Sequence, residues 1–120
     1  MKRATVRSAV LMVTIAVWPL AGRATDYTPM DCAKAASAAQ RTVCADYQLG
    51  QFEARMATLF EWSTSLVAMG QRGQLLDDQR TFIDQREVCG TSVSCLRGAY
   101  LARISRLEAV MNAMESRGPF

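Results

Sequence analysis

The sequence predicts an all-α protein, a small antiparallel helical hairpin or bundle of three to four helices held together by two disulfides. Three observations support this fold class. Apolar residues recur at alternating steps of three and four, which places them on one face of a helix. Four cysteines stand in a chain of only 120 residues. The sequence also lacks strand-like alternation of apolar and polar residues over any useful length.

The N-terminal segment has the pattern of a secretory signal peptide. Positive charges near the start precede an apolar run at 9–21, which is shorter than the roughly 20 residues of a membrane span. Gly22 and Ala24 are small enough for the −3 and −1 positions of a signal-peptidase site. We therefore predict that residues 1–24 are cleaved and that the mature chain, 25–120, is a single domain. The alternative is a retained membrane anchor.

Cleavage would also reverse the sign of the net charge, which is +3 for the whole chain. The whole chain carries 14 basic and 11 acidic residues, but four of the basic ones precede residue 25. The mature chain would have a net charge of −1, which gives no support to nucleic-acid binding. The "LAG" at 20–22 is followed by Arg23, where a lipoprotein signal needs a cysteine. We expect a periplasmic or secreted protein without a lipid or membrane anchor, and the sequence leaves its oligomeric state open.

All four cysteines, Cys32, Cys44, Cys89 and Cys95, lie in the predicted mature chain. An even number of cysteines in a short exported chain indicates two disulfides. Three pairings are possible. The local one, Cys32–Cys44 with Cys89–Cys95, is favoured because each pair brackets a short segment that can fold back. In the loop-entropy model, closing loops of these lengths stabilises a fold by about 3 and about 2.4 kcal/mol.

Two helices are expected in the first half of the mature chain. A polar lead-in at 25–30 precedes an alanine-rich segment, 31–45, without glycine or proline. Ser37 and Gln40 have the spacing of a capping box, which favours a helix start there. Asp46 can cap a second, longer helix. The residues expected on the buried face of that helix are Leu49, Phe52, Met56, Leu59, Ser63 and Leu66, with Phe60, Val67 and Met69 beside them.

Two further helices are expected in the second half. The "MGQRGQ" at 69–74 contains two glycines and predicts the turn of a helical hairpin. A third helix should cover 75–88. Gly90 then breaks the pattern, and Thr91 or Ser92 can cap a fourth helix. The expected inner faces are Leu75, Leu76, Gln79, Phe82, Ile83 and Arg86 on the third helix, and Leu96, Ala99, Tyr100, Arg103, Ile104, Leu107 and Met111 on the fourth.

The residue types exclude several kinds of catalytic and metal site. The chain has no histidine, so histidine-dependent nucleophilic catalysis and imidazole ligands to zinc are impossible. The gaps between the cysteines fit neither a four-thiolate zinc site nor a C-x-x-C redox motif. Asp84 and Glu87 can face one another on a helix, but a solvated face paired with Arg80 and Arg86 is the simpler interpretation. We expect no enzyme activity, no metal and no cofactor.

Polar residues on the predicted inner faces allow two interpretations. In the structural one, Arg86 packs its aliphatic stem and pairs with Glu53 or Asp84 at the edge of the core. In the functional one, Arg86, Tyr100 and Arg103 form a recognition cluster beside the second predicted disulfide. The structural interpretation is favoured.

Three stretches resemble the LprI-type lysozyme inhibitor family, a group of small exported bacterial domains. They are "DCAKAASAAQRTVCAD", "LGQFEARMATLF" and "QRTFIDQREVCGTSVSCLRGAYLARISRLE", within 31–108. Gln40, Glu53 and Phe82 depart from the family pattern, which usually has Glu, Asp and Trp there. The change at Gln40 removes a charge that can pair with a basic residue. The matching residues are Asp31, Cys32, Lys34, Ala35, Val43, Cys44, Leu49, Phe52, Gln79, Arg80, Arg86, Cys89, Cys95, Leu96, Tyr100, Arg103, Ile104 and Leu107.

The resemblance implies a helical, disulfide-linked domain of the cell envelope that binds and blocks lysozyme or a related muramidase. Lysozyme cleaves with two carboxyl groups in a groove, and a rigid loop can plug such a groove. The segment 89–95, here called the disulfide-closed turn, is the candidate plug. Its hydroxyls, on Thr91, Ser92 and Ser94, would hydrogen-bond the catalytic acids. The neighbouring Arg97 would pair with one of them.

The alternative function is an envelope interaction module that binds another exported protein or a peptidoglycan fragment without inhibiting anything. Both functions need exposed contact residues on a rigid frame. The candidate partner-binding residues are Arg86, Thr91, Ser92, Ser94, Arg97, Tyr100 and Arg103.

Overall fold

The computed structural model describes residues 30–118, and within that range every regular element is helical. The all-α class is therefore confirmed, and the four α-helices agree with the predicted three to four. The predicted signal peptide, 1–24, and most of the polar lead-in lie outside the described residues. The elements are a 3-10 turn, η1 (Cys32–Lys34), a short helix, α1 (Ala38–Ala45), and three long helices, α2 (Tyr47–Leu66), α3 (Met69–Cys89) and α4 (Val93–Glu115).

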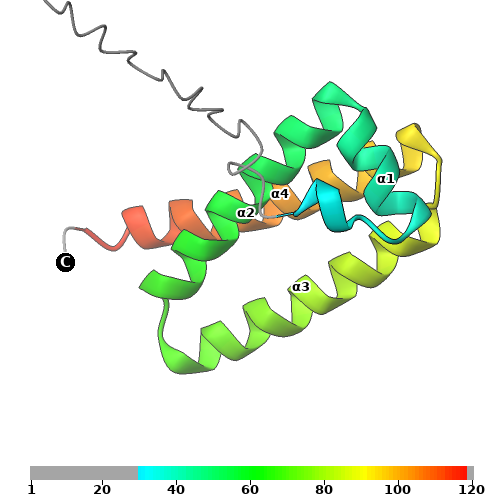
Figure 1. Ribbon diagram of the computed structural model, residues 1–120. Helices are drawn as coiled ribbons and strands as arrows, with labels where there is room; N and C mark the ends of the chain where they lie inside the picture. The colour runs from blue at the N-terminus through cyan, green and yellow to red at the C-terminus, as the bar shows by residue number, and fades with distance from the viewer. Residues whose placement is uncertain (1–29, 119–120) are drawn as a thin grey trace, which may run out of the picture.

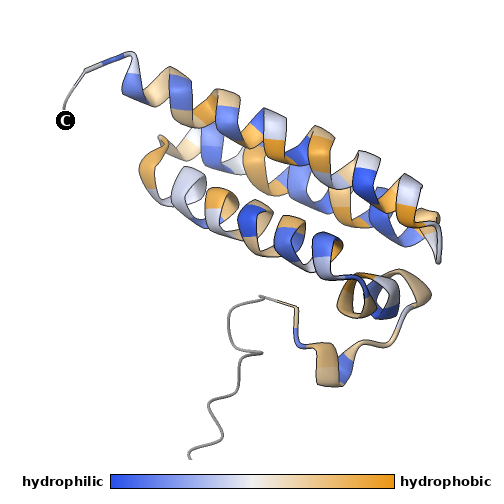
Figure 2. Ribbon diagram, turned by 90° about the horizontal axis from the view of Figure 1, so that it is seen from above, coloured by the Kyte–Doolittle hydropathy of each residue, from blue (hydrophilic) through white to orange (hydrophobic). Residues whose placement is uncertain are grey.

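The three long helices run side by side, each antiparallel to the one before it (Figures 1 and 2). Short connections between successive helices dictate this arrangement. The short helix α1 lies at the end of the bundle where α3 turns into α4 (Figure 1). Each of the four α-helices contacts the other three. In the part of the chain that the structure describes, the helices are too polar or too short to span a bilayer.

Side chains at the helix starts explain where three of the helices begin. Ser37 Oγ accepts a hydrogen bond from Gln40 N at 3.0 Å, and Gln40 Oε1 accepts from Ser37 N at 3.2 Å. This is the expected capping box, and it begins α1. Asp46 Oδ1 accepts from Leu49 N at 2.9 Å and begins α2. Ser92, one of the two candidates, caps α4.

Both disulfides have the local pairing that was favoured. Cys32–Cys44 connects η1 to α1, with 5.7 Å between the Cα atoms. Cys89–Cys95 joins the end of α3 to the first turn of α4, with 5.5 Å between the Cα atoms. Each disulfide therefore holds elements that are already neighbours in the sequence.

The core lies where the inner faces of the long helices meet, and it largely confirms the predicted stripes. Leu49 on α2 and Leu96, Tyr100 and Leu107 on α4 have no exposed surface. Four residues expected inside are exposed instead: Leu66 at 49%, Met69 at 80%, Leu76 at 41% and Ile83 at 39%. Leu66 ends α2, and the next residue, Val67, takes the inner position. Leu76 and Ile83 follow the buried Leu75 and Phe82 by one residue, which turns them about 100° away from the core.

The turn predicted at 69–74 is wrong. Helix α3 begins at Met69, and only Val67 and Ala68 separate it from α2. Met69 is 80% exposed, so it does not extend the buried face of α2. Two extended residues suffice because the buried Val67 anchors the connection. The Nε atom of Arg72 also donates to the carbonyl of Thr64 at 2.7 Å, which ties the first turn of α3 to α2.

Replacement of two glycines by alanine should therefore have opposite effects. Gly73 lies inside α3 with no neighbouring atom within 4 Å of an added Cβ. Gly73→Ala should raise the free energy of unfolding by about 0.5–1 kcal/mol, because glycine is the weaker helix former. Gly90 has a φ of +56°, which disfavours any side chain, so Gly90→Ala should lower it by about 1 kcal/mol or more. Urea unfolding measures both, and a destabilised Gly73→Ala variant would support a turn at 69–74.

Candidate binding surface

The disulfide-closed turn, 89–95, joins α3 to α4 at one end of the bundle (Figure 1). Its backbone is ordered by its own hydrogen bonds. Gly90 N donates to the Glu87 carbonyl at 3.2 Å, and Ser92 N donates to the Cys89 carbonyl at 3.1 Å. Cys95 N donates to Ser92 Oγ at 3.3 Å. The turn is therefore rigid before it meets any partner.

Four of the candidate contact residues are exposed on or beside this turn: Thr91, Ser92, Ser94 and Arg97. The hydroxyls of Ser92 and Ser94 lie 3.3 Å apart. Arg97, one residue beyond the buried Leu96, makes no ion pair or hydrogen bond with the residues that the structure describes. Together these side chains offer hydroxyl groups and one guanidinium, a combination that suits a carboxylate.

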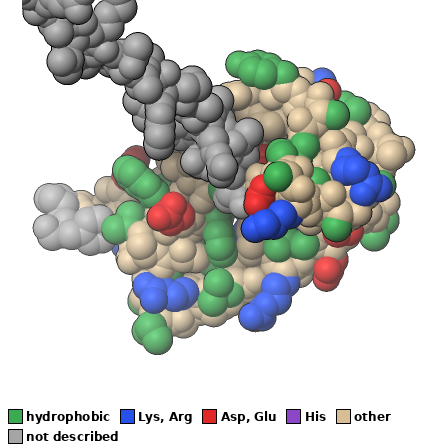
Figure 3. Space-filling model, in the orientation of Figure 1, with side chains coloured by type: hydrophobic (Ala, Val, Ile, Leu, Met, Phe, Trp, Pro, Cys, Tyr) green, Lys and Arg blue, Asp and Glu red, His purple; other side chains and the backbone are tan. Residues whose placement is uncertain are grey.

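An open apolar hollow of about 490 Å³ lies next to the turn. The disulfide itself, Cys89–Cys95, forms part of its wall, and Ala99 and Val88 add aliphatic surface. Val88 is 88% exposed. Elsewhere, acidic and basic side chains are interspersed over the face drawn in Figure 3, without a large patch of one sign.

The other three candidates are directed into the protein. Arg86, Tyr100 and Arg103 are only 7%, 0% and 4% exposed. They bond to groups within the chain, as the structural interpretation expects, and do not form a surface beside the disulfide. The described residues contain no cluster of three or more histidine, cysteine or acidic side chains that is arranged to hold a metal.

Glu53, on α2, is the centre of a buried polar cluster. Tyr100 Oη donates to Glu53 Oε2 at 2.5 Å, and Arg86 Nη1 lies 3.7 Å from the same oxygen. The Nε and Nη2 atoms of Arg86 donate to Glu87 Oε1 at 3.2 and 3.0 Å. The ring of Tyr100 packs edge-on against Phe82, with 5.1 Å between the centroids. Residues from α2, α3 and α4 thus meet at one carboxylate.

The pairing of Arg86 with Glu53 was one of two predicted, but the bond from Tyr100 to Glu53 was missed. A signal for it existed in the sequence. Glu53 follows Leu49 by four residues and precedes Met56 by three, so it belongs to the buried stripe of α2, and it is only 4% exposed.

The environment changes the acidity of both partners of Glu53. Burial raises the pKa of Tyr100 above its usual range, and the negative charge of Glu53 raises it further. Burial alone would lower the pKa of Arg86. Its interactions with Tyr100, Glu87 and Glu53 outweigh that effect, so that the pKa of Arg86 is raised. Tyr100 therefore stays protonated and remains a donor to the carboxylate.

Arg103 forms a second internal link, between α4 and α3. Its Nε donates to Gln79 Oε1 at 3.0 Å, and its Nη2 donates to the carbonyl of Leu75 at 3.1 Å. Asp78 lies 3.9 Å from Nη1, and the guanidinium lies 5.9 Å from the ring centroid of Phe60. Burial lowers the pKa of Arg103, an effect that Asp78 opposes. The role of Arg103 is to join helices, since its donors are directed at the chain itself.

Comparison of the chain with models of protein families, with curated proteins and with solved structures finds no match. The LprI-type assignment therefore stays a prediction from the motifs of the sequence.

Removal of the Tyr100 hydroxyl should destabilise the protein. Tyr100→Phe deletes the buried donor to Glu53 and leaves that carboxylate with only the more distant Arg86. We expect the free energy of unfolding to fall by about 1.5–3 kcal/mol, as for other hydrogen bonds to charged groups. Urea unfolding at pH 7 measures the loss. Tyr47→Phe is the control, because Tyr47 is 83% exposed, and equal effects of the two variants would contradict the prediction.

The raised pKa of Tyr100 should also make stability depend on alkaline pH. Tyrosine in the unfolded chain loses its proton at about pH 10, whereas folded Tyr100 keeps its proton to higher pH. The contribution is thus complete below about pH 10 and is lost as the pH rises from there towards the folded pKa. Urea midpoints between pH 8 and 11 should fall more steeply for the wild type than for Tyr100→Phe. Parallel curves would show that Tyr100 does not titrate differently on unfolding.

Proposed function

We propose that the protein is an exported, non-enzymatic inhibitor of lysozyme or a related muramidase, of the LprI type. The observation that carries this proposal is the disulfide-closed turn. It is ordered by its own hydrogen bonds and presents Thr91, Ser92 and Ser94 to solvent, with Arg97 beside it. The two disulfides suit an oxidising compartment, which in bacteria is the periplasm or the exterior.

The proposed mechanism is obstruction of the catalytic groove. A muramidase that works with two carboxyl groups offers hydrogen-bond acceptors, and ionised acids, at the bottom of a cleft. The hydroxyls of the turn would donate to these acids, and Arg97 would pair with an ionised one. Because the disulfide and the backbone hydrogen bonds already order the turn, little conformational entropy is lost on binding.

The buried cluster around Glu53 fixes the position of the disulfide-closed turn. Arg86 precedes Cys89 by three residues, and Tyr100 follows Cys95 by five, so the cluster holds both ends of the turn. Both side chains meet the same Glu53 oxygen on α2. The turn is therefore fixed relative to the whole bundle, as a plug against a rigid groove requires.

The test is a lysozyme turbidity assay with the purified protein. We expect a stoichiometric amount to slow the clearing of bacterial cell walls. Arg97→Ala and Thr91→Gly should each weaken inhibition by about tenfold or more, since contacts at the centre of an interface dominate its affinity. Arg106→Ala is the control, because it removes an exposed arginine from the same helix about two and a half turns further on. Unchanged lysis at excess protein would remove the inhibitor proposal.

The alternative function, an envelope interaction module without inhibitory activity, is favoured by one observation. The apolar hollow beside the turn and the exposed Val88 next to it can accept an aliphatic or aromatic side chain of a partner. A pull-down from an envelope extract, made with the wild type and with Val88→Asp, tests it. A protein that the wild type captures and the variant loses, together with a negative lysozyme assay, would support this function.

A further inference from the structure

A second hollow, separate from the disulfide-closed turn, has the character of a small binding site. It has a volume of about 310 Å³, within the lower range of small-molecule sites. Its lining comes from the two residues before η1 and from η1, α1, α2 and α3. It is almost entirely polar: Met30, Asp31, Lys34, Gln40, Glu53 and Arg86. Two carboxylates and two cations face it, so the lining has no net charge.

Glu53 and Arg86, the two buried charged residues of the lining, each have an atom whose hydrogen bonding within the described residues is incomplete. Glu53 Oε2 accepts from Tyr100, but Glu53 Oε1 makes no hydrogen bond with the described residues. Arg86 Nη1 lies 3.7 Å from Glu53 Oε2, which is too far for a hydrogen bond, and the guanidinium also interacts with the Tyr100 hydroxyl. Among the described residues, Ser63 Oγ is the only fully enclosed side-chain nitrogen or oxygen atom without a hydrogen-bond partner. Glu53 Oε1 and Arg86 Nη1 therefore retain access to the outside, and both residues line this hollow.

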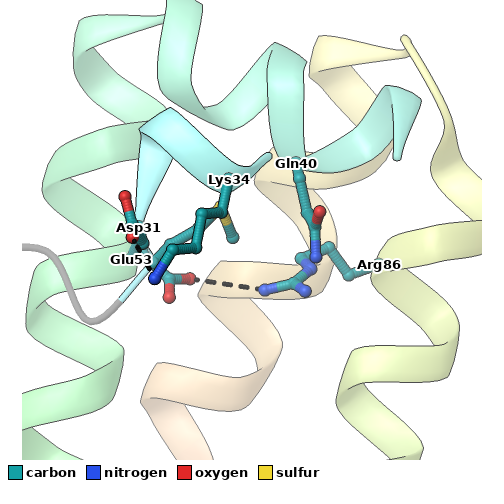
Figure 4. Close-up of a pocket in the computed structure, with 6 residues that line it drawn as sticks. Asp31, Lys34, Gln40, Glu53 and Arg86 are labelled. Atoms are coloured by element: carbon teal, nitrogen blue, oxygen red, sulfur yellow. Dashed lines mark ion pairs between the residues drawn. The ribbon is translucent and has the colours of Figure 1, made fainter. Parts of the chain in front are cut away.

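Gln40 adds a further donor on the side of Arg86. Its Oε1 accepts from Ala36 N at 2.8 Å and from Ser37 N at 3.2 Å, which fixes the orientation of the amide. The Nε2 group is thus turned away from the helix start and makes no hydrogen bond with the described residues. Figure 4 shows Gln40 and Arg86 on one side of the hollow and Asp31 and Glu53 on the other, with the ammonium of Lys34 near Asp31.

We propose that this hollow binds a small zwitterion of the α-amino acid type. Its ammonium group would bind Glu53 Oε1 and would take the place of the exposed Lys34 ammonium at Asp31. Its carboxylate would bind Gln40 Nε2 and Arg86 Nη1. An ion of one sign is disfavoured because it would face a like charge on one side. A molecule with both charges a short distance apart satisfies both sides and gives partners to two poorly satisfied buried groups. The proposal does not rest on lysozyme inhibition.

The direct test is a titration of the ¹⁵N-labelled purified protein, followed by NMR, with L-alanine, L-glutamate, L-lysine and L-phenylalanine in parallel. At least one should cause saturable shifts at residues of the hollow, with a dissociation constant of about 1 mM or below. The amide and the N-acetyl derivative of that amino acid, which lack one of the two charges, should each bind at least about tenfold more weakly. The absence of saturable shifts with all four amino acids would overturn the proposal, as would equal binding of either derivative.

Gln40→Glu offers a sharper test because the fold should survive it. The variant keeps Oε1 for the capping box but replaces the amide donor by a negative oxygen next to Arg86. That oxygen would take the place of the ligand carboxylate. We expect a higher melting temperature and at least a tenfold loss of amino-acid affinity.

Gln51→Glu is the matched control, since it makes the same charge change at an exposed position of α2 outside the hollow. It should leave the affinity for the amino acid unchanged. Unchanged affinity in Gln40→Glu would show that the carboxylate does not bind there, and lost affinity in Gln51→Glu would show that overall charge controls binding. Either result would overturn the proposal, whatever the outcome of the lysozyme assay.

Discussion

The rest of the structure depends on one buried carboxylate, that of Glu53. A charge in the interior is tolerated only when it is paired and hydrogen-bonded, because the low dielectric makes an isolated ion very costly. Tyr100 Oη and Arg86 provide that pairing from two other helices. Any shift of α3 or α4 against α2 would separate the carboxylate from its partners. The cost of leaving Glu53 unpaired therefore selects one arrangement of the bundle.

The disulfides join residues that are close in the sequence, whereas the polar clusters join residues that are far apart in it. The disulfides span 12 and 6 residues along the chain, so they strengthen connections that are already local. The bond from Tyr100 to Glu53 spans 47 residues, and those from Arg103 to Gln79 and Leu75 span 24 and 28. Packing of apolar side chains brings the long helices together, and these directional bonds define how they are placed. The exposed turn and the polar hollow both inherit their geometry from this placement.

Arg86 lines the polar hollow and also lies about one helical turn before the disulfide-closed turn. Two of its nitrogens donate to Glu87, while the third faces Glu53 and the hollow. Three residues later, α3 ends at Cys89, where the disulfide-closed turn starts. A ligand that binds Arg86 would thus lie close to the base of the turn. The polar hollow and the disulfide-closed turn therefore share α3 as a support.

The sequence by itself determined the fold class from its apolar periodicity, and it determined the capping box of Ser37 and Gln40 and the cap of Asp46, which depend on neighbours within one helical turn. It favoured the local disulfide pairing among three and offered Thr91 or Ser92 as the cap of α4, without choosing between these alternatives. It also predicted that Thr91, Ser92, Ser94 and Arg97 lie on or beside the disulfide-closed turn. Only the tertiary structure decided which of them face solvent, that α3 starts at Met69, and that Tyr100 bonds to Glu53. Periodicity shows which face of a helix a residue occupies. What that face contacts depends on helices that are tens of residues away in the sequence. The bond between Tyr100 and Glu53 therefore exists only once α2 and α4 have packed.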